Sequence, residues 1–470
     1  MDRAVPNAAF MQSNGGKRTV SSYVIKGYEM IKSAVWPALL ALGLATAAQA
    51  AQAVPVIPGA AGFGMSTPAG RGGEIYKVTN LNDSGSGSLR ACVEASGPRV
   101  CVFEVSGAIQ LQKDLRIQNP YITIAGQTAP SPGISLYGGT VRIYDTHDVL
   151  IQHIRIRVGD ANGGSDPINR DALDLAGGSG VNNVVLDHVS ASWALDEMVS
   201  VWKGRNVTIR NSIISEALDE HRFAYSDGNV GKGPIVGPGT NNVLFSGNLL
   251  AHNRARNVRS KSDGLVFANN VVYDYAYFGT DIGEGSSSSR TSIVGNAYVH
   301  GPAYDGASAI NIRGNLASGS RIFIEDNIAP GGNSNNPWSI VKNGASFNPR
   351  VNTAPIWPEG FTALPASQVQ SYVAAKAGAR PVDRDEVDAR VVRDLQNRTG
   401  GLINSPSEVG GFPNLERNTR RLTLPERPHA DDDGDGYTNL EEWLHGYARQ
   451  VEGSGGDSVA PQAPKGLRVE

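Results

Sequence analysis

The segment LVFANN, at residues 265–270, is a short apolar run that ends in an amide side chain. From about residue 75 onward, similar short β-branched runs recur, and each ends in an amide or imidazole side chain. The end residues are Gln127, His153, His188, Asn211, Asn248, Asn270, Asn296 and Asn327. Their spacing varies irregularly from 22 to 37 residues. A repeated unit with a short minimum step is typical of a solenoid whose coils carry loops of different length.

The repeated runs are too short for helices, and almost no helical pattern separates them, so alternating strand and helix units are disfavoured. We therefore expect an all-β fold, a right-handed parallel β-helix over residues 51–335. Its coils should stack at about 4.8 Å, the spacing of strands in a sheet. Asparagine suits the bends because it tolerates left-handed backbone and its amide can bond to the next coil. A β-sandwich is the main alternative, but its strands usually recur about every 8–12 residues.

The composition agrees with many turns, since the 470 residues include 56 glycines and 26 prolines and only 19% are charged. Residues 1–50 are expected to be a secretory signal peptide, because Lys26 and Lys32 precede an apolar run that ends in A-x-A at residues 48–50. The run from Met30 is complete as a signal peptide by itself, so Met30 is a second candidate start. We expect a secreted, extracellular monomer with no membrane partner.

Cys92 and Cys101 are the two cysteines of the chain. In an exported protein, such a pair predicts a disulfide that closes a small loop, and two buried free thiols are the less favoured alternative. Two cysteines are too few for a metal cluster.

A set of polar residues follows the coil spacing. Asp171, Asp196 and His221 are 25 residues apart, and Arg256 comes 35 residues further on, after a glycine-rich stretch. Coil spacing can bring such side chains into one column. Stacked carboxylates repel each other unless a cation lies between them, and oxygen ligands in an exported protein favour Ca²⁺. We therefore expect Asp171 and Asp196, with Glu197 as a further candidate, to bind Ca²⁺ beside Arg256. His221 is equally compatible with a substrate-facing group and with a coil-edge residue.

Five segments carry a family resemblance in the same order over about residues 62–330. They are GFGMSTPAGRGGEIYKVTNLNDSGSGSLRACV, IAGQTAP, DHVSASWALDE, NVTIRNSII and NRARNVRSKSDGLVFANNVVYDY. Together they resemble the pectate lyases of polysaccharide lyase family one, and especially the secreted pectate lyase C branch. The resemblance implies a parallel β-helix, Ca²⁺-dependent cleavage of de-esterified homogalacturonan by β-elimination, and an arginine that acts as the base.

The family's R-x-P-R-x-R run matches residues 256–261. Arg256 then takes the position of the base, while Arg259 and Lys261 support it or bind substrate carboxylates. Val258 stands where the family has proline. Lys261 stands where it has arginine, which retains the charge but loses the bidentate fork.

The family's first two calcium aspartates match Asp171 and Asp196. The third falls on Ser200, which carries no charge. This departure leaves the calcium shell one carboxylate short, and Glu197 is the substitute candidate.

A second calcium motif lies near the C-terminus. Residues 431–442 fit the pattern D-x-D-x-D-G-x5-E of an EF-hand loop. The expected ligands are Asp431, Asp433, Asp435, the Tyr437 carbonyl, Asn439 and Glu442. A helix is expected to leave the loop, but the proline-rich residues 424–430 argue against an entering helix. We expect half an EF-hand that binds a structural calcium ion, and a solvated acidic turn is the alternative.

The remaining sequence divides into a loop and helical extension that packs on the solenoid (residues 336–425), the calcium loop with its helix (426–450) and a flexible tail (451–470). Within the extension, residues 369–400 have helical character with a glycine stop at Gly400.

Three alternatives to a pectate lyase stay open in part. A pectin hydrolase needs an acid and a base carboxylate, and the solenoid region has no N-T-D, D-D or G-H-G cluster. A lyase for another uronate polymer, or a non-catalytic adhesive β-helix, also fits the solenoid. The net charge of −3 gives no support to nucleic-acid binding. The expected partner is an acidic plant cell-wall polysaccharide.

Overall fold

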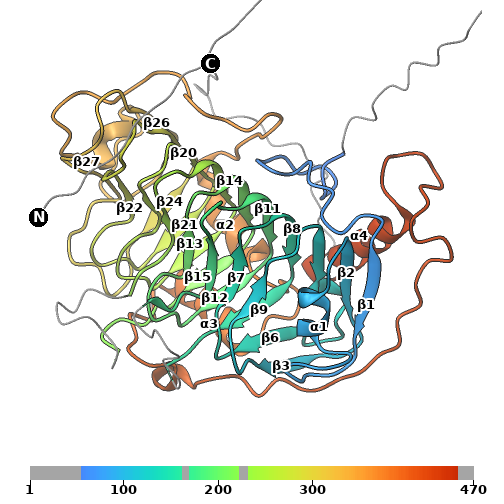
Figure 1. Ribbon diagram of the computed structural model, residues 1–470. Helices are drawn as coiled ribbons and strands as arrows, with labels where there is room; N and C mark the ends of the chain where they lie inside the picture. Colours follow the sequence, from blue (N-terminus) through green and yellow to red (C-terminus); the bar gives the residue numbers. More distant parts are fainter. Residues whose placement is uncertain (1–53, 161–168, 222–230, 454–470) are drawn as a thin grey trace, which may run out of the picture. The chain divides into compact units, whose positions relative to one another are not determined.

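The computed structural model describes residues 54–160, 169–221 and 231–453 (Figure 1). The predicted signal peptide, and all but the first residues of the predicted tail, lie outside the described residues. Among the residues described, no helix is both long enough and apolar enough to span a membrane.

Three parallel sheets run the length of the solenoid (Figure 1). The ten-stranded sheet contains, in spatial order, β1 (Glu74–Val78), β2 (Arg99–Phe103), β5 (Ile122–Ala125), β8 (His147–Gln152), β11 (Asn182–Asp187), β14 (Arg205–Arg210), β17 (Asn241–Ser246), β20 (Gly264–Ala268), β23 (Arg290–Val294) and β26 (Arg321–Glu325). The eight-stranded sheet contains β3 (Gly107–Gln110), β6 (Ile134–Tyr137), β9 (Ile154–Arg157), β12 (Ser190–Ser192), β15 (Ile213–Ser215), β18 (Leu249–Ala251), β21 (Val271–Tyr273) and β24 (Ala297–Val299). The nine-stranded sheet contains β4 (Leu115–Ile117), β7 (Val141–Tyr144), β10 (Leu173–Ala176), β13 (Val199–Val201), β16 (Ile235–Val236), β19 (Arg259–Ser260), β22 (Thr280–Ile282), β25 (Ile310–Ile312) and β27 (Val341–Asn343).

Each coil visits the ten-stranded, eight-stranded and nine-stranded sheets in turn, so β8, β9 and β10 are followed by β11 in the ten-stranded sheet. Successive coils pair in parallel, as where β11 pairs with β8 on one side and β14 on the other. The predicted parallel β-helix is therefore confirmed.

The short apolar runs arise because the ten-stranded sheet is covered on both faces. Phe245 and Phe267 point into the interior of the solenoid. Leu244 and Val266 point outward and pack against a separate cluster that includes Ile356. Fully burying one such side chain stabilises the fold by about 1.5–3 kcal/mol.

The polar residues at the bends after the ten-stranded sheet fall at two different register positions. His153, His188 and Asn211 themselves adopt left-handed backbone, with φ of 58°, 51° and 48°. From Asn248 onward, the left-handed residue is the preceding one. The asparagines are therefore one register position later, and they form a ladder of their own. Asn248 Nδ2 donates to Asn270 Oδ1 at 2.9 Å, and the ladder continues through Asn296 to Asn327.

The disulfide between Cys92 and Cys101 is present, with a Cα–Cα distance of 6.0 Å. It joins helix α1 (Leu89–Glu94) to β2, the second strand of the ten-stranded sheet. The predicted pairing is confirmed.

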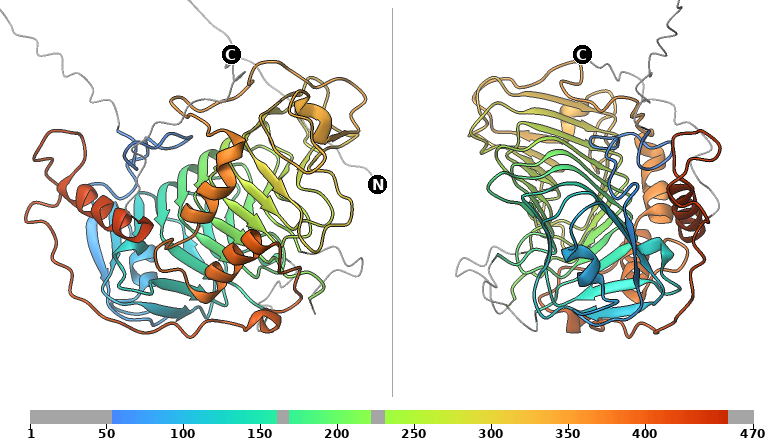
Figure 2. Two further views of the ribbon diagram at one scale, coloured as in Figure 1. Left: turned by 180° about the vertical axis from the view of Figure 1, so that it is seen from behind. Right: turned by 45° about the vertical axis from the view of Figure 1, so that its right-hand side comes forward.

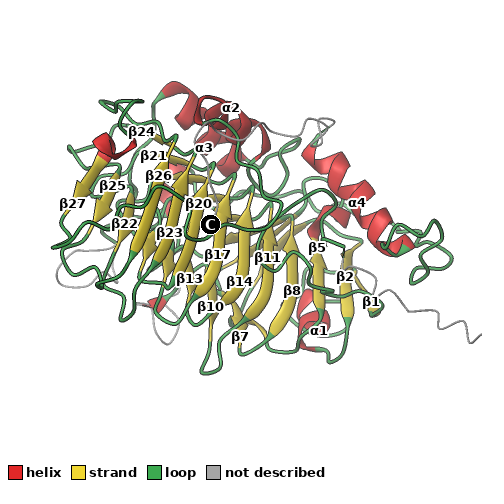
Figure 3. Ribbon diagram, turned by 90° about the horizontal axis from the view of Figure 1, so that it is seen from above, coloured by secondary structure: helices red, strands yellow, loops and turns green. Residues whose placement is uncertain are grey.

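Three longer helices lie against the sheets (Figures 2 and 3). Helices α2 (Ala366–Lys376) and α3 (Glu386–Asn397) cover the outer face of the eight-stranded sheet, where Val369 and Val391 contact Ile213 and Leu249. Helix α4 (Asn439–Glu452) packs through Leu440 and Leu444 on the first strands of the ten-stranded sheet. The short 3₁₀ helices that lie wholly within the described residues include η1 (Gly126–Thr128), η3 (Pro337–Ile340) and η4 (Pro406–Val409).

The helical stretch expected over residues 369–400 is divided into two helices. Gly378, at φ 102°, and Pro381 lie in the interruption between α2 and α3. Helix α3 ends before the expected Gly400, because Arg398 already adopts left-handed backbone at the C-cap.

Candidate active site

One face of the nine-stranded sheet carries a row of polar side chains. Leu173 and Leu175 of β10 belong to the solenoid core, so Asp174 between them points outward. Strand pairing aligns Asp174 with Ser200, Ile235, Arg259 and Asp281 on the following coils. Because side chains alternate between the two faces of a strand, this outer face carries a row that is mostly polar, interrupted by Ile235 of β16.

The sequence-predicted acidic residues lie just before these strands. Asp171, Asp196 and Glu197 each bring one carboxylate oxygen within 4.8 Å of the others. All three residues are buried, at 7%, 6% and 9% exposure. The structure brings together these three candidate calcium ligands.

The register within this group differs from the spacing inferred from sequence. Asp171 is in register with Glu197, and isolated bridges continue the row from Glu197 to Lys232 and then to Ala255. Asp196 therefore lies one residue before the row, next to Glu197, and Arg256 lies one residue after it, next to Ala255. His221 lies outside it, and its Nε2 is 2.8 Å from the Leu195 carbonyl oxygen. Burial lowers the pKa of the His221 imidazole.

The group suits a hard divalent cation. Burial first, and then the nearby charges of Asp196 and Asp174, raise the pKa of Asp171 well above its usual value. An oxygen-liganded cation among these groups would stabilise the ionised carboxylate. Carboxylate oxygens are the ligands that Ca²⁺ prefers, so the residues present fit a calcium ion.

Ser200 is the residue that the resemblance aligns with the family's third aspartate. Its hydroxyl donates to Asp171 Oδ2 and lies 3.0 Å from Asp174 Oδ1. Asp174, which the sequence analysis missed, supplies a carboxylate beside Ser200 from the preceding coil. Asp174 also pairs with Arg142 at 2.5 Å. Its position 26 residues before Ser200, one coil away, was the available signal.

Two cations contact the acidic group directly. Lys232 Nζ pairs with Asp196 Oδ1, and Arg256 Nη1 pairs with Glu197 Oε1. Lys232 was also missed, because the coil that contains it is lengthened by an insertion and falls out of simple spacing.

Arg256 is unusual for an arginine. Its backbone is left-handed, with φ of 62°, a conformation that strains a non-glycine residue and is common at functional sites. Burial, and next the charge of Arg259, lower the pKa of Arg256 to about 10, although Asp196 and Asp281 oppose this shift. The neutral guanidine form of Arg256 is therefore more populated at a given pH than that of an arginine in water.

A second ionic cluster lies next to Arg256. Lys261 Nζ is 3.2 Å from Glu284 Oε2, and Arg259 also pairs with Glu284. Arg313 bridges Glu284 and Asp281 at 2.7 Å each. These pairs hold Arg259 and Lys261 in place while leaving three cations against two carboxylates.

The groups open into a cleft of about 520 Å³. Its lining includes the residues Arg142, Asn169, Asp171, Asp174, Asp196, Glu197, Ser200, Trp202, Lys232, Ile235, Arg256 and Lys261. Trp202 is 39% exposed and offers an apolar face among the charges. His221 and Arg259 do not line the cleft.

The C-terminal acidic loop is compact. One carboxylate oxygen each of Asp431, Asp433 and Asp435 lies within 4.8 Å of the others. Asp431 accepts hydrogen bonds from the backbone N–H groups of Gly434 and Gly436, at 2.7 and 3.0 Å.

The exit from this loop is helical, because α4 begins at Asn439 with Thr438 as its N-cap. No helix occurs in the described residues 424–430 that precede the loop. Asn439 Nδ2 donates to the Arg427 carbonyl, and Tyr437 donates its hydroxyl to the Pro55 carbonyl. Desolvation first, and then the charges of Asp433, Asp435 and Asp431, raise the pKa of Glu442. Its carboxylate is not among the three whose oxygens lie within 4.8 Å of one another.

Comparison with known proteins gives a consistent result. No family model matches the chain. The protein described as probable pectate lyase C of Aspergillus fumigatus is 35% identical over 419 residues, which cover 86% of this chain and 90% of that protein. The probable pectate lyase C of Emericella nidulans is 32% identical over 405 residues, 84% of this chain and 87% of that protein.

Solved structures resemble the chain more distantly. A pectate lyase from Paenibacillus sp. 0602 has a TM-score of 0.46 at 10% identity, covering 72% of this chain and 99% of its own. A pectate lyase from Acidovorax avenae subsp. citrulli has a TM-score of 0.45 at 13% identity, covering 72% and 98%.

The β-helix and its charged cleft define the class as a β-helical polysaccharide lyase. Because the A. fumigatus relative is matched over nine-tenths of its length at 35% identity, the chain belongs to the pectate lyase family. The resemblance predicted from the sequence is therefore confirmed.

Proposed function

We propose that the protein is a secreted, calcium-dependent pectate lyase. It cleaves de-esterified homogalacturonan by β-elimination and leaves 4,5-unsaturated oligogalacturonides. The observation that carries this proposal is the meeting of a buried carboxylate group and an arginine of lowered pKa in one cleft. Family membership supports the same activity.

An active-site calcium ion would be held by Asp171, Asp196 and Glu197, with Ser200 beside Asp171. When bound, the ion withdraws charge from the C6 carboxylate of a galacturonate and acidifies the C5 proton. The backbone N–H of Glu197 donates to Asp171 Oδ1 at 3.0 Å and so orients the Asp171 carboxylate.

Substrate binding uses the cations of the cleft. Lys232, Arg256 and Lys261 line it, and the charge of Arg259 acts on Arg256 from outside the lining. A polymer with one carboxylate per sugar complements such a row of positive charges, and Trp202 offers its ring to a sugar face.

Arg256 acts as the base. Its neutral guanidine takes the C5 proton, and the electron pair of the C–H bond becomes the C4–C5 double bond as the C4–O bond breaks. The departing oxygen takes a proton from water. With a pKa of about 10, roughly a tenth of the Arg256 side chains are neutral at pH 9, so the reaction favours alkaline conditions.

The C-terminal loop binds a second, structural calcium ion through Asp431, Asp433 and Asp435, together with Tyr437 O, Asn439 and Glu442. The convergence of the three carboxylates and the helix that leaves the loop support this assignment. The ion would fix the start of α4 against the solenoid.

The test is incubation of purified residues 51–470 with polygalacturonate at alkaline pH, with Ca²⁺ or with a chelator. We expect the ultraviolet absorbance of a conjugated unsaturated uronide to rise only with Ca²⁺. Highly methylated pectin and alginate run in parallel should give slower rises. New reducing ends without absorbance would indicate a hydrolase. Binding without cleavage of any polymer would indicate a non-catalytic β-helix.

A further inference from the structure

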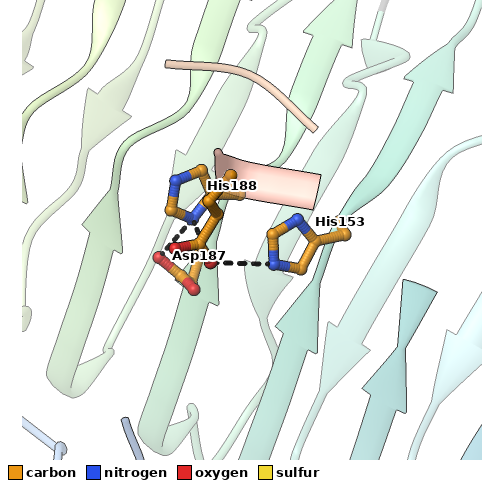
Figure 4. A group of neighbouring side chains, drawn as sticks. His153, Asp187 and His188 are labelled. Carbon is orange, nitrogen blue, oxygen red and sulfur yellow. Dashed lines mark hydrogen bonds and ion pairs between the residues drawn. The ribbon is translucent and has the colours of Figure 1, made fainter. Parts of the chain in front are cut away.

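A second group of metal-ligating side chains lies outside the cleft, at the bend between the ten-stranded and eight-stranded sheets. His153 follows β8, while Asp187 ends β11 and is followed by His188. Glu452 is the last residue of α4. One ligand atom from each of the four lies within 4.8 Å of the others. Figure 4 shows His153, Asp187 and His188, which point toward one another. The cleft lies on the nine-stranded sheet, so the two sites are on different edges of the coil.

The two imidazoles are presented by equivalent positions of consecutive coils. Their rings stack at 5.0 Å between centroids with only 10° between the planes. Both are buried, at 0% exposure for His153 and 3% for His188. The solenoid therefore fixes both rings before any ion binds.

Among the described residues, the second ring nitrogen of His153 faces a carboxylate but makes no hydrogen bond of ordinary geometry. Its Nδ1 lies 2.8 Å from the Ala379 carbonyl oxygen, which can only accept, so Nδ1 carries the proton of the neutral ring. Among the described residues, the buried Nε2 has no hydrogen-bond partner of suitable geometry. Glu452 Oε1 faces this Nε2 at 3.3 Å. A nitrogen lone pair and a carboxylate oxygen at that distance repel each other unless a cation lies between them.

The distances suit a metal ion as that cation. His188 Nδ1 is 3.0 Å from Asp187 Oδ1 and 3.7 Å from Glu452 Oε1. Around a tetrahedral zinc ion with bonds of 2.0–2.1 Å, neighbouring ligand atoms lie roughly 3.3 Å apart. The three distances, including the 3.3 Å between His153 and Glu452, are close to this value.

Outer contacts complete the arrangement. A metal-ligating histidine usually donates its other N–H to a carbonyl or a carboxylate, as His153 does to Ala379. Gln152 Nε2 donates to Asp187 Oδ2 at 2.9 Å, and Arg210 Nε is 3.7 Å from Asp187 Oδ1. The Glu452 side chain is 24% exposed, which leaves a path for an ion.

A cation would also stabilise the carboxylate of Glu452 at its position in the helix. A carboxylate at the C-terminus of a helix lies at the negative end of the helix dipole, where it is unfavourable. A metal ion would reverse that interaction. It would also join the end of α4 and the Ala379 loop to two coils of the solenoid.

We propose that His153, Asp187, His188 and Glu452 form a structural site for a divalent transition metal, with Zn²⁺ as the preferred ion. Imidazole ligands favour Zn²⁺ over Ca²⁺, so the site is chemically distinct from both proposed calcium sites. It braces the C-terminal helix against the β-helix. This proposal does not depend on the lyase activity.

The test loads full-length folded protein with Zn²⁺, removes free metal by dialysis in excess Ca²⁺, and measures bound zinc by elemental analysis. One equivalent per chain is expected. Co²⁺ in place of Zn²⁺ should give the visible absorption of a tetrahedral nitrogen–oxygen site. The thermal midpoint should rise with Zn²⁺.

Glu452→Gln and His153→Gln remove one ligand each, and the first change lies at the edge of the fold, where misfolding is not expected. Both should weaken zinc binding at least about tenfold. His147→Gln, which changes a half-exposed histidine of β8, should leave zinc binding unchanged.

Absence of retained zinc in the unaltered protein would overturn the proposal, as would equal zinc binding by Glu452→Gln. A proton in place of the metal has a distinct signature. Stability would then be independent of Zn²⁺ and would fall as rising pH deprotonates the histidines, whereas zinc affinity rises with pH.

Discussion

The ten-stranded and nine-stranded sheets are built by the same coils, yet their stacked residues differ in kind. In the ten-stranded sheet, Phe245 is in register with Phe267, and the outward residues are also covered. In the nine-stranded sheet, the inner residues are apolar, whereas the outward residues are mostly polar, with Ile235 as an apolar exception. Its outward row places Asp174, Arg259 and Asp281 in line.

The difference shows how one backbone carries two roles. Stacking like residues stabilises a sheet when they are apolar, and destabilises it when they carry the same charge. The outward row therefore depends on opposite charges, such as the pair of Arg142 with Asp174, and on bound ligands. Stability resides in one sheet and chemistry in the other, so substitutions in the two should have separable effects.

The largest separation is expected from Arg256→Ala. Removing a positioned base lowers kcat by about 10²–10⁴-fold, while the thermal midpoint should hardly change because Arg256 lies in the cleft rather than the core. The matched control is Arg254→Ala, since Arg254 pairs with Asp219 and does not line the cleft. Retention of more than about a tenth of kcat would contradict the role of Arg256.

Phe267→Ala is the converse change. Phe267 is fully buried in the solenoid core, so its truncation should reduce the free energy of unfolding by about 3–5 kcal/mol. Chemical denaturation measures the loss. The folded fraction should retain its specific activity, and a selective loss of kcat would show that the two sheets are coupled.

Asn270→Ala tests the bend that joins the ten-stranded sheet to its neighbour. Asn270 Oδ1 accepts from Asn248 and its Nδ2 donates to Asn296, so the change leaves buried amides unpaired. We expect a loss of about 1–3 kcal/mol in unfolding free energy. An exposed control, Asn397→Ala at the end of α3, should cost much less.

The pH profile sharpens the description of the cleft. If neutral Arg256 is the base, kcat rises about tenfold per pH unit until pH approaches its pKa of about 10. The charge of Arg259 lowers that pKa, so Arg259→Ala should raise it and move the rising limb to higher pH. If the rise of kcat with pH occurs at the same pH in the variant, or at a lower pH, the charge of Arg259 does not lower the pKa of Arg256.

Ser200→Asp adds the carboxylate that the family pattern has at this position. We expect Ca²⁺ to bind roughly tenfold more tightly, about 1.4 kcal/mol, because another charged ligand joins the site. Without Ca²⁺ the variant should be less stable, since Asp171 and Asp174 lie within hydrogen-bonding distance of residue 200. Calorimetric titration measures the affinity, and unchanged binding would place the ion away from Ser200.

The fold could be predicted from the sequence where the same kind of residue recurs in every coil because each coil places it in the same environment. Apolar strands covered on both faces leave an uninterrupted pattern, so the solenoid and most of its strands could be predicted. The register of the bends could not be predicted. The sequence shows a polar residue after each apolar run, but it does not show whether that residue adopts the left-handed conformation or follows the residue that does.

The residues that meet in the cleft could be predicted in part for a related reason, and their roles stay predictions. Asp171, Asp196 and Glu197 could be found from one-coil spacing, and Arg256 from its family motif. Lys232 could not, because a loop insertion conceals its register with Glu197. Glu452 is hundreds of residues from His153 and meets it only through the packing of α4.

The most direct test is a crystal structure of the Arg256→Lys variant with Ca²⁺ and an oligogalacturonate. The account predicts Ca²⁺ bound to Asp171, Asp196 and Glu197, a galacturonate carboxylate on that ion, and the sugar C5 facing residue 256. Calcium bound elsewhere, or a sugar whose C5 faces away from residue 256, would contradict it.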